Sequence, residues 1–500
     1  MIGAVGYKVI TLNRNQKELY QIMNTLSKKS LHVALAGLGT LGLAGAADAV
    51  MVNANGLGQV LIYPYYTVRS PAGAGVAQYN TLLSIVNTTN SVKAVKVRFK
   101  EGKASKEVLD FNVFLSPKDM WTAAVEPDGA GGAQVETDDK SCTIPTFGGA
   151  PQKFRTTLSA ADIIGGDVDR VTEGYFEVWE MATYGAADPV AVGATHNNGV
   201  PANCGAVTDT SAAVNPRAPS GGLFGGATLI NVLTGDAFTE DATALIQFQP
   251  TVGAGAYFTT GSPLPTYDNA TPTVGSGVNG SGQIITGSFP NGRSAVTAAL
   301  QKTFVGNEFV LEKTTLSGTD WVITFPTKAD HVTETLVELP FQNKLSKTGS
   351  CDDTVVTTWD REEGKITPGG PDFSPSPKPT GFALCWEANV ISFKNDKASG
   401  IANVLGSANN YTLSTSFVSG WGSIAFRAGA INVATGGVAS YDPVTGGAAI
   451  PAPSTTFSGL PTIGFAVQTF VNGTLTNGTG TLVQSSYGGN FGHRYIGPQP

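Results

Sequence analysis

Strict alternation of apolar and polar residues is the dominant pattern along this chain. Val95, Val97 and Phe99 alternate with lysine and arginine, and residues 109–115 alternate in the same way. A period of two is typical of a strand with one face buried and the other in water. A further run, residues 81–87, ends at the polar turn cluster 87–91. These closely spaced strands predict an antiparallel meander of a β-sandwich.

Further strands are expected along most of the chain. Their ranges are 174–181, 227–233, 244–248, 321–325, 335–341, 382–393, 421–426 and 463–471. Long helical periodicity is absent, and 62 glycines and 28 prolines would break helices. We therefore expect an all-β fold of antiparallel β-sandwich domains, of Ig-like or jelly-roll type, with long loops rich in glycine, threonine and proline.

The N-terminal region predicts export. Lys28 and Lys29 precede a short apolar stretch, residues 31–46, and Ala47-Asp48-Ala49 supplies a small-residue cleavage pattern. We expect a signal peptide over residues 1–49, with either Met1 or Met23 as the start. The mature protein is then extracellular, on the cell surface or periplasmic. No later apolar run approaches 18 residues, so we expect no transmembrane helix.

The composition changes across residues 185–220, where long stretches of glycine and alanine separate the strands. We place the domain boundary there. The prediction is an N-terminal β-sandwich domain over residues 50–216, and one or more β-rich domains over residues 217–500.

Charge is sparse. Charged residues make up 14% of the chain and the net charge is −7, against a usual charged share of about 25%. The chain has no basic block, so we expect no nucleic-acid partner. The exposed strand faces are expected to carry threonine, serine and asparagine, and low charge removes one common protection against edge-to-edge pairing.

The four cysteines predict disulfides, because an even number in an exported chain usually pairs. They are Cys142, Cys204, Cys351 and Cys385, and they allow three pairings. We favour Cys142–Cys204 and Cys351–Cys385, since each pair closes a stretch rich in glycine and proline.

Motifs for known catalytic chemistry are missing from the sequence. The histidines after residue 49 are far apart, and the H-E-x-x-H, C-x-x-C-H and G-x-S-x-G patterns do not occur. We assign no catalytic residue, expect no cofactor and no metal centre, and favour a protein without enzymatic activity.

The stretch between Cys351 and Cys385 is the most distinctive segment. It is rich in acids, at Asp352, Asp353, Asp360, Glu362 and Glu363. Oxygen-rich loops can bind Ca²⁺, but this spacing does not match the EF-hand pattern. We therefore favour an acidic surface loop closed by a disulfide, with a ligand or calcium loop as the alternative.

An exposed tryptophan is a second kind of candidate binding residue, because exposed aromatic rings can stack on sugars. Trp359 lies in a charged segment and is the best candidate for stacking on a glycan. Trp321 and Trp421 lie within apolar alternation and are expected in the core. A single exposed ring does not make a binding platform.

Three phrases occur together along the chain: residues 56–66 (GLGQVLIYPYY), 320–328 (DWVITFPTK) and 487–491 (YGGNF). In these phrases the chain resembles an exported family of proteobacterial surface-type proteins that has no assigned activity. The resemblance spans most of the mature chain and implies no catalytic residues.

Together these features favour a secreted or cell-surface structural or interaction protein that forms a homo-oligomer or a surface assembly through strand edges. Residues 81–87 or 59–68 are the expected edge strands, since an unpaired edge can recruit another strand. The alternative is a module that binds extracellular glycans, or a hydrolase whose site the sequence does not reveal.

Overall fold

Antiparallel strands dominate the structure, a computed structural model, which confirms the predicted all-β, sandwich-like fold. The structure describes residues 49–69, 79–158, 162–165, 168–366, 382–395, 402–426, 430–432, 438–439, 456–476, 479–480 and 482–498. The predicted signal peptide lies outside these ranges, apart from Ala49. Within the described ranges, no helix is long and apolar enough to cross a membrane. The Ig-like or jelly-roll type remains a prediction.

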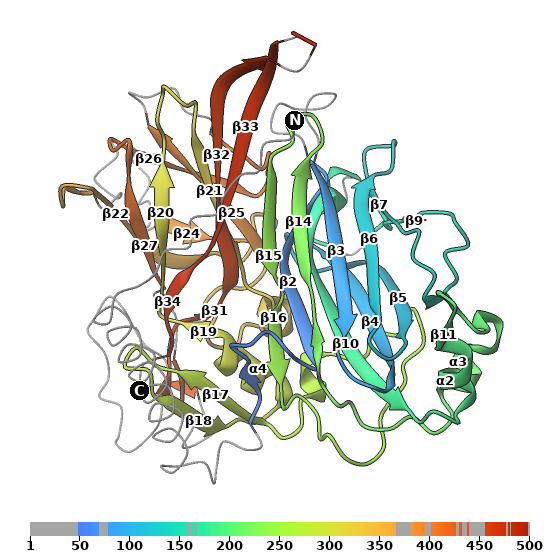
Figure 1. The fold of residues 1–500 in the computed structure, drawn as a ribbon. Helices are drawn as coiled ribbons and strands as arrows, with labels where there is room; N and C mark the ends of the chain where they lie inside the picture. Colours follow the sequence, from blue (N-terminus) through green and yellow to red (C-terminus); the bar gives the residue numbers. More distant parts are fainter. Residues whose placement is uncertain are drawn as a thin grey trace, which may run out of the picture. The chain divides into compact units, whose positions relative to one another are not determined.

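Two sheets form a sandwich from the N-terminal half of the chain (Figure 1). Sheet 1 has the order β1 (Met51–Val52), β16 (Thr243–Ile246), β2 (Val60–Thr67), β10 (Glu173–Tyr184), β4 (Val92–Glu101), β5 (Glu107–Leu115) and β8 (Cys142–Ile144). Sheet 2 has the order β15 (Ala237–Asp241), β14 (Gly226–Asn231), β3 (Tyr79–Asn87), β6 (Met120–Pro127), β7 (Ala133–Glu136) and β9 (Gln152–Lys153), and β13 (Leu223–Phe224) also pairs with β3.

The core of this sandwich is aromatic. Phe99 stacks on Phe176 with ring centroids 4.8 Å apart, and Phe111 packs against Trp121 at 5.5 Å. Phe99, Phe111 and Phe176 come from sheet 1 and Trp121 from sheet 2, and all four are buried. Large buried rings contribute most of the apolar area that holds two such sheets together.

Strands that follow the predicted domain boundary at residues 216 and 217 complete both N-terminal sheets. β14 pairs with β3, and β16 pairs with β2. The described residues belong to one compact unit, Asp48–Pro500.

Two more sheets are built mainly from the C-terminal half. Sheet 3 has the order β23 (Lys365–Ile366), β22 (Asp352–Asp360), β27 (Ser419–Phe426), β20 (Phe304–Val310) and β34 (Arg494–Ile496), and β24 (Phe382–Leu384) also pairs with β22. Sheet 4 has the order β26 (Asn410–Thr415), β25 (Ala388–Asn395), β21 (Gly318–Thr324), β32 (Ile463–Thr476) and β33 (Leu482–Gly492).

Trp321 lies at the centre of the core between sheets 3 and 4, as predicted, and is fully buried. Its ring packs against Phe393 at 4.9 Å, and its indole nitrogen donates to the carbonyl of Glu308 at 3.2 Å. The predicted strand over residues 335–341 is wrong, because this segment forms turns beside the short helix α5 (Lys328–His331).

A third apolar cluster joins the two sandwiches. Tyr65 and Phe238 of the N-terminal strands pack there with Val322 and Phe465 of sheet 4. The hydroxyl of Thr324 also donates to the carbonyl of Pro64 at 2.6 Å. A shared core and buried polar contacts of this kind couple the stability of the two halves.

The expectation that β4 has one face in water is wrong. Both faces of β4 are buried, and the side chains of Lys96 and Arg98 are 0% and 4% exposed. Residues 257–267, which we call the strap, cover this face: Lys96 donates to the carbonyl of Thr259 at 2.7 Å, and Arg98 donates to that of Pro265, also at 2.7 Å. Alternation marked the two faces correctly, but sequence alone did not show that a distant segment covers the polar one.

Candidate functional site

The five acids of the candidate calcium loop lie at opposite ends of one strand. Asp352 and Asp353 begin β22, whereas Asp360 ends it and Glu362 and Glu363 follow in the turn. A nine-residue strand is about 26 Å long at roughly 3.3 Å per residue. The five residues therefore do not form one cluster, and among the described residues no group of three or more His, Cys, Asp or Glu could hold a metal ion.

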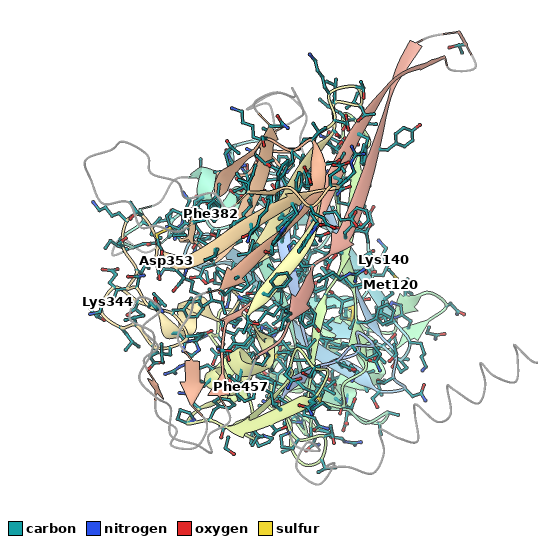
Figure 2. The ribbon with its side chains drawn as sticks, turned by 90° about the vertical axis from the view of Figure 1, so that its left-hand side faces the viewer. Met120, Lys140, Lys344, Asp353, Phe382 and Phe457 are labelled. Atoms are coloured by element: carbon teal, nitrogen blue, oxygen red, sulfur yellow. A yellow bond between two sulfur atoms is a disulfide. The ribbon has the colours of Figure 1, made fainter. Side chains whose placement is uncertain are left out.

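Asp352 has a structural role. Its carboxylate forms a buried ion pair with Lys328 at 2.9 Å and accepts a hydrogen bond from the backbone of Gln342 at 3.0 Å. A buried charge needs such partners to offset its lost hydration. Asp353, the next residue on the strand, is exposed (Figure 2).

Asp360 closes the turn between β22 and β23. One of its oxygens accepts hydrogen bonds from the backbone of Glu362 at 2.9 Å and of Gly364 at 2.6 Å. Glu362 and Glu363 are exposed in this turn. The carboxylate of Asp360 thus shapes the hairpin, and the two glutamates stand in solvent beside it.

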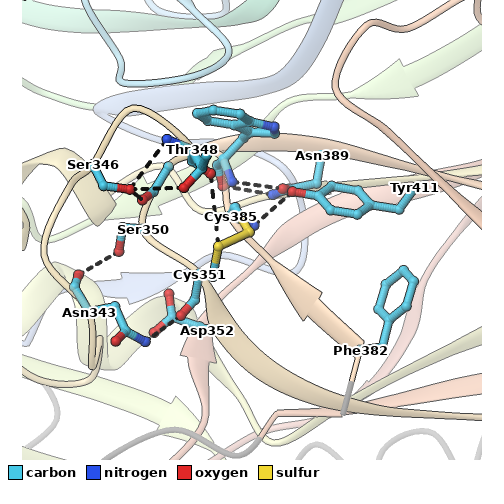
Figure 3. The surroundings of a disulfide bond; sticks show 12 residues. Asn343, Ser346, Thr348, Ser350, Cys351, Asp352, Phe382, Cys385, Asn389 and Tyr411 are labelled. Atoms are coloured by element: carbon cyan, nitrogen blue, oxygen red, sulfur yellow. Dashed lines mark hydrogen bonds between the residues drawn. A yellow bond between two sulfur atoms is a disulfide. The ribbon is translucent and has the colours of Figure 1, made fainter. Parts of the chain in front are cut away.

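Both disulfides have the pairing that the sequence favoured. Cys142 of β8 is bonded to Cys204 of a short 3-10 helix, and Cys351 is bonded to Cys385. Around the second bond, the amide of Asn343 donates to the carbonyl of Cys351. The hydroxyl of Tyr411 accepts from the backbone of Cys385 at 2.9 Å (Figure 3). These contacts fix both ends of the acidic segment.

Trp359 has an aromatic partner that the sequence did not reveal. Its ring stacks on Trp421, with centroids 4.1 Å apart and planes inclined by 9°. The two residues are direct partners across β22 and β27. The prediction that Trp421 belongs to the core is wrong, because this residue is 43% exposed.

The register explains why Trp421 faces outward. Along β27, Gly422, Ile424 and Phe426 are buried, and Trp421 points to the opposite face. A side chain at Gly422 would approach the ring of Trp321 to 3.1 Å, so this glycine leaves room for the buried indole. The glycine therefore takes an inward position, and the exposed tryptophan falls on the outer face.

Charged residues stand at both ends of this tryptophan pair. Lys365 of β23 is the strand partner of Trp359, and its ammonium lies 5.8 Å from that ring centroid. Glu308 of β20 is the strand partner of Trp421 and is exposed. We call Lys365, Trp359, Trp421 and Glu308 the aromatic row. It crosses four strands of sheet 3 and presents aromatic surface between a cation and a carboxylate.

The three histidines after residue 49 lie in separate environments. Burial lowers the pKa of His331 and of His493 to about 4, so both are neutral at physiological pH. His196 lies near Asp119, at 3.5 Å. The structure does not bring these histidines together into one site.

No family model matches the chain, and neither the curated proteins nor the solved structures contain a match.

Proposed function

We propose that this protein is an exported structural or interaction protein that assembles with copies of itself through strand edges. The observation that carries the proposal is the hairpin of β32 and β33, which extends beyond the rest of sheet 4 (Figure 1). We also propose that the chain belongs to an exported family of proteobacterial surface-type proteins, on the basis of the three sequence phrases.

The far part of this hairpin lacks further strand neighbours in the described structure. β21 pairs with β32 only from Ile463 to Thr469, while the β32–β33 pairing continues to Thr476 and Leu482. We call the two strand segments 471–476 and 482–486 the arm. A two-stranded ribbon is at best marginally stable in water, so an added strand from a second molecule would stabilise it.

The strands predicted as assembly edges cannot serve in this way. β3, which contains residues 81–87, lies between β14 and β6, and β2 lies between β16 and β10. Among the described residues, the outermost strands of sheet 4 are instead β33 and β26, and the base of β33 contacts β15 through Asn490, which donates to the carbonyl of Thr239. Pairing of one molecule's arm with the β26 edge of the next would be head-to-tail, and such contacts propagate into filaments unless they close into a ring.

The test is to shorten the arm. Replacing residues 472–485 with Asn-Gly joins Val471 to its strand partner Ser486 by a two-residue turn. We expect the unaltered chain to form oligomers or filaments in light scattering and negative-stain electron microscopy, and the shortened chain to be monomeric with the same melting temperature. The control replaces residues 128–132, between the paired residues Pro127 and Ala133, with the same turn. An unaltered chain that stays monomeric at high concentration contradicts the proposal.

The aromatic row favours a second candidate, the binding of extracellular glycans. Tryptophan rings offer flat apolar faces to sugars, and neighbouring charged groups can bond to sugar hydroxyls. Because Trp359 and Trp421 stack on one another, each has one face occupied, and the partly exposed Trp421 is the better contact. A glycan array should then show binding that Trp421→Ala abolishes and that Tyr487→Ala, which removes a 52% exposed ring elsewhere, leaves intact.

A further inference from the structure

A pocket of about 230 Å³ lies where β1, β17 (Val274–Val278), β19 (Gln301–Lys302) and β34 meet. Its lining includes residues from both the N-terminal and the C-terminal strands. At roughly 30 Å³ for each water, it would hold about eight water molecules, or a small organic molecule. The aromatic row and the arm contribute none of its lining residues.

Lys302 brings an unmatched positive charge to this pocket. Its ammonium donates to the carbonyl of Thr462 and lies 4.6 Å from the centroid of the Tyr495 ring. Among the described residues, no carboxylate forms an ion pair with it. Lys302 is partly buried, and a charge withdrawn from water is normally paired, so this ammonium is available to an anion.

Gln301, the residue before Lys302, has a hydrogen-bond acceptor without a partner in the described structure. Gln301 is 2% exposed and lines the pocket, and its amide nitrogen donates to the carbonyl of Gly459 at 3.0 Å. Its amide oxygen is buried and has no hydrogen-bond partner in the described structure. A buried acceptor without a partner is unfavourable, and a donor on a ligand would satisfy it.

Two other titratable groups of the pocket, His493 and Glu240, are not fully charged at neutral pH. His493 is neutral, because burial lowers its pKa to about 4, and it donates to the carbonyl of Val322 at 3.0 Å. Burial raises the pKa of Glu240 to about 7, so its carboxyl group is partly protonated at neutral pH. Burial also lowers the pKa of Lys302 to about 8, which leaves the ammonium mostly charged at pH 7.

We infer that the pocket binds a small organic acid that carries a hydroxyl or amino group beside its carboxylate. Lys302 holds the carboxylate, and the amide oxygen of Gln301 accepts a hydrogen bond from the hydroxyl or amino group. The volume of about 230 Å³ suits a hydroxy acid or an amino acid with a short side chain.

Isothermal titration of the full chain with L-lactate, D-glycerate, L-alanine and L-serine tests this inference. We expect at least one of these acids to bind with a Kd of about 1 mM or tighter, in the range open to so small a ligand. The matching amide, which has the same shape without the negative charge, should bind at least about tenfold more weakly. Absence of binding by all four acids overturns the inference.

Two variants test which side chains contact the bound acid. Lys302→Met should weaken the bound acid about tenfold or more, and Gln301→Leu should reduce the preference for that acid over propionate, which lacks the hydroxyl or amino donor. Lys344→Met removes an exposed lysine and is the matched control. Equal binding by the control and Lys302→Met contradicts the role of Lys302.

A measurement on the unaltered protein covers the case in which a variant misfolds. Acetylation by acetic anhydride, read by peptide mass spectrometry, reports the accessibility of each lysine. The bound acid should slow the modification of Lys302 and leave that of Lys344 unchanged. Equal rates with and without the acid show that the ligand does not occupy this pocket.

Discussion

Glu173 of β10 accepts a hydrogen bond of 2.6 Å from the hydroxyl of Ser407, which lies 234 residues further along the chain. The same carboxylate accepts from the hydroxyl of Tyr65 at 2.6 Å and from the backbone of Ala408 at 2.8 Å. One buried acid of the N-terminal sandwich thus organises the loop that leads into β26 of sheet 4. Together with the apolar cluster around Tyr65 and Phe465, it couples the two sandwiches.

Glu173→Ala should therefore destabilise the whole molecule. The substitution leaves several buried donors without an acceptor, and breaking a buried charged network of this kind costs about 3–5 kcal/mol. We expect the loss in urea unfolding followed by tryptophan fluorescence, with the two halves then unfolding in separate steps. Asp353→Ala, at an exposed acid, is the control and should change the unfolding free energy by less than about 0.5 kcal/mol.

We predict that the buried carboxyl group of Glu387 makes the free energy of unfolding fall as the pH rises. Burial raises the pKa of this carboxyl group to about 8, from about 4.3 in an unfolded chain. The folded protein therefore holds a proton that the unfolded chain loses, so this contribution is fully present below about pH 4.3 and is lost as the pH rises towards 8. Glu387→Gln cannot ionise, and its unfolding free energy should vary less between pH 5 and 8.

The measurement is urea unfolding at pH 5, 6, 7 and 8, with Glu362→Gln, at an exposed position, as the control. His331 and His493 act in the opposite direction. Their folded pKa values of about 4 lie below the unfolded value, so their contribution is present above about pH 6.5 and is lost as the pH falls towards 4. A decline of equal slope in Glu387→Gln and in the unaltered protein contradicts the role of Glu387.

Local patterns in the sequence predicted many of the strands, but they missed β20, β22 and β33 and did not indicate the partners of each face. The alternation in β4 separated Val95, Val97 and Phe99 from Lys96 and Arg98 correctly. The strap that covers the charged face comes from residues about 160 positions away, and the local period contains no information about such a contact. The segment 335–341 was predicted as a strand from its apolar residues, but it forms turns beside α5.

The candidate sites show the same limit. Trp359 could be selected from its charged surroundings, but its pairing with Trp421 depends on the register of β22 and β27, which brings together residues 62 positions apart. The pocket around Lys302 depends on strands from both ends of the chain. The acids of the candidate calcium loop are close in sequence, yet the extended strand between them moves them apart.

Both disulfides should contribute substantially to stability. They close segments of 62 and 34 residues, and the chain-entropy model gives about 4 kcal/mol for each loop. We expect Cys142→Ala/Cys204→Ala and Cys351→Ala/Cys385→Ala to lower the unfolding free energy by comparable amounts. Peptide mass spectrometry of the unreduced protein checks the pairing, and crossed pairs such as Cys142–Cys351 would contradict the structure.

Arg98→Ala should release the strap while leaving the sandwich folded. Arg98 holds the strap through the carbonyls of Pro265 at 2.7 Å and Ser262 at 3.2 Å, and its loss leaves both acceptors without this donor. Its charge is also paired with Glu107 at 2.8 Å. Amide hydrogen exchange should therefore rise about tenfold or more in residues 258–266, as expected for a local loss of about 1.4 kcal/mol, while exchange in β10 stays unchanged. Lys118→Ala, at a lysine outside the strap, is the matched control. Uniformly faster exchange across both sandwiches would mean that Arg98 supports the whole fold and not the strap alone.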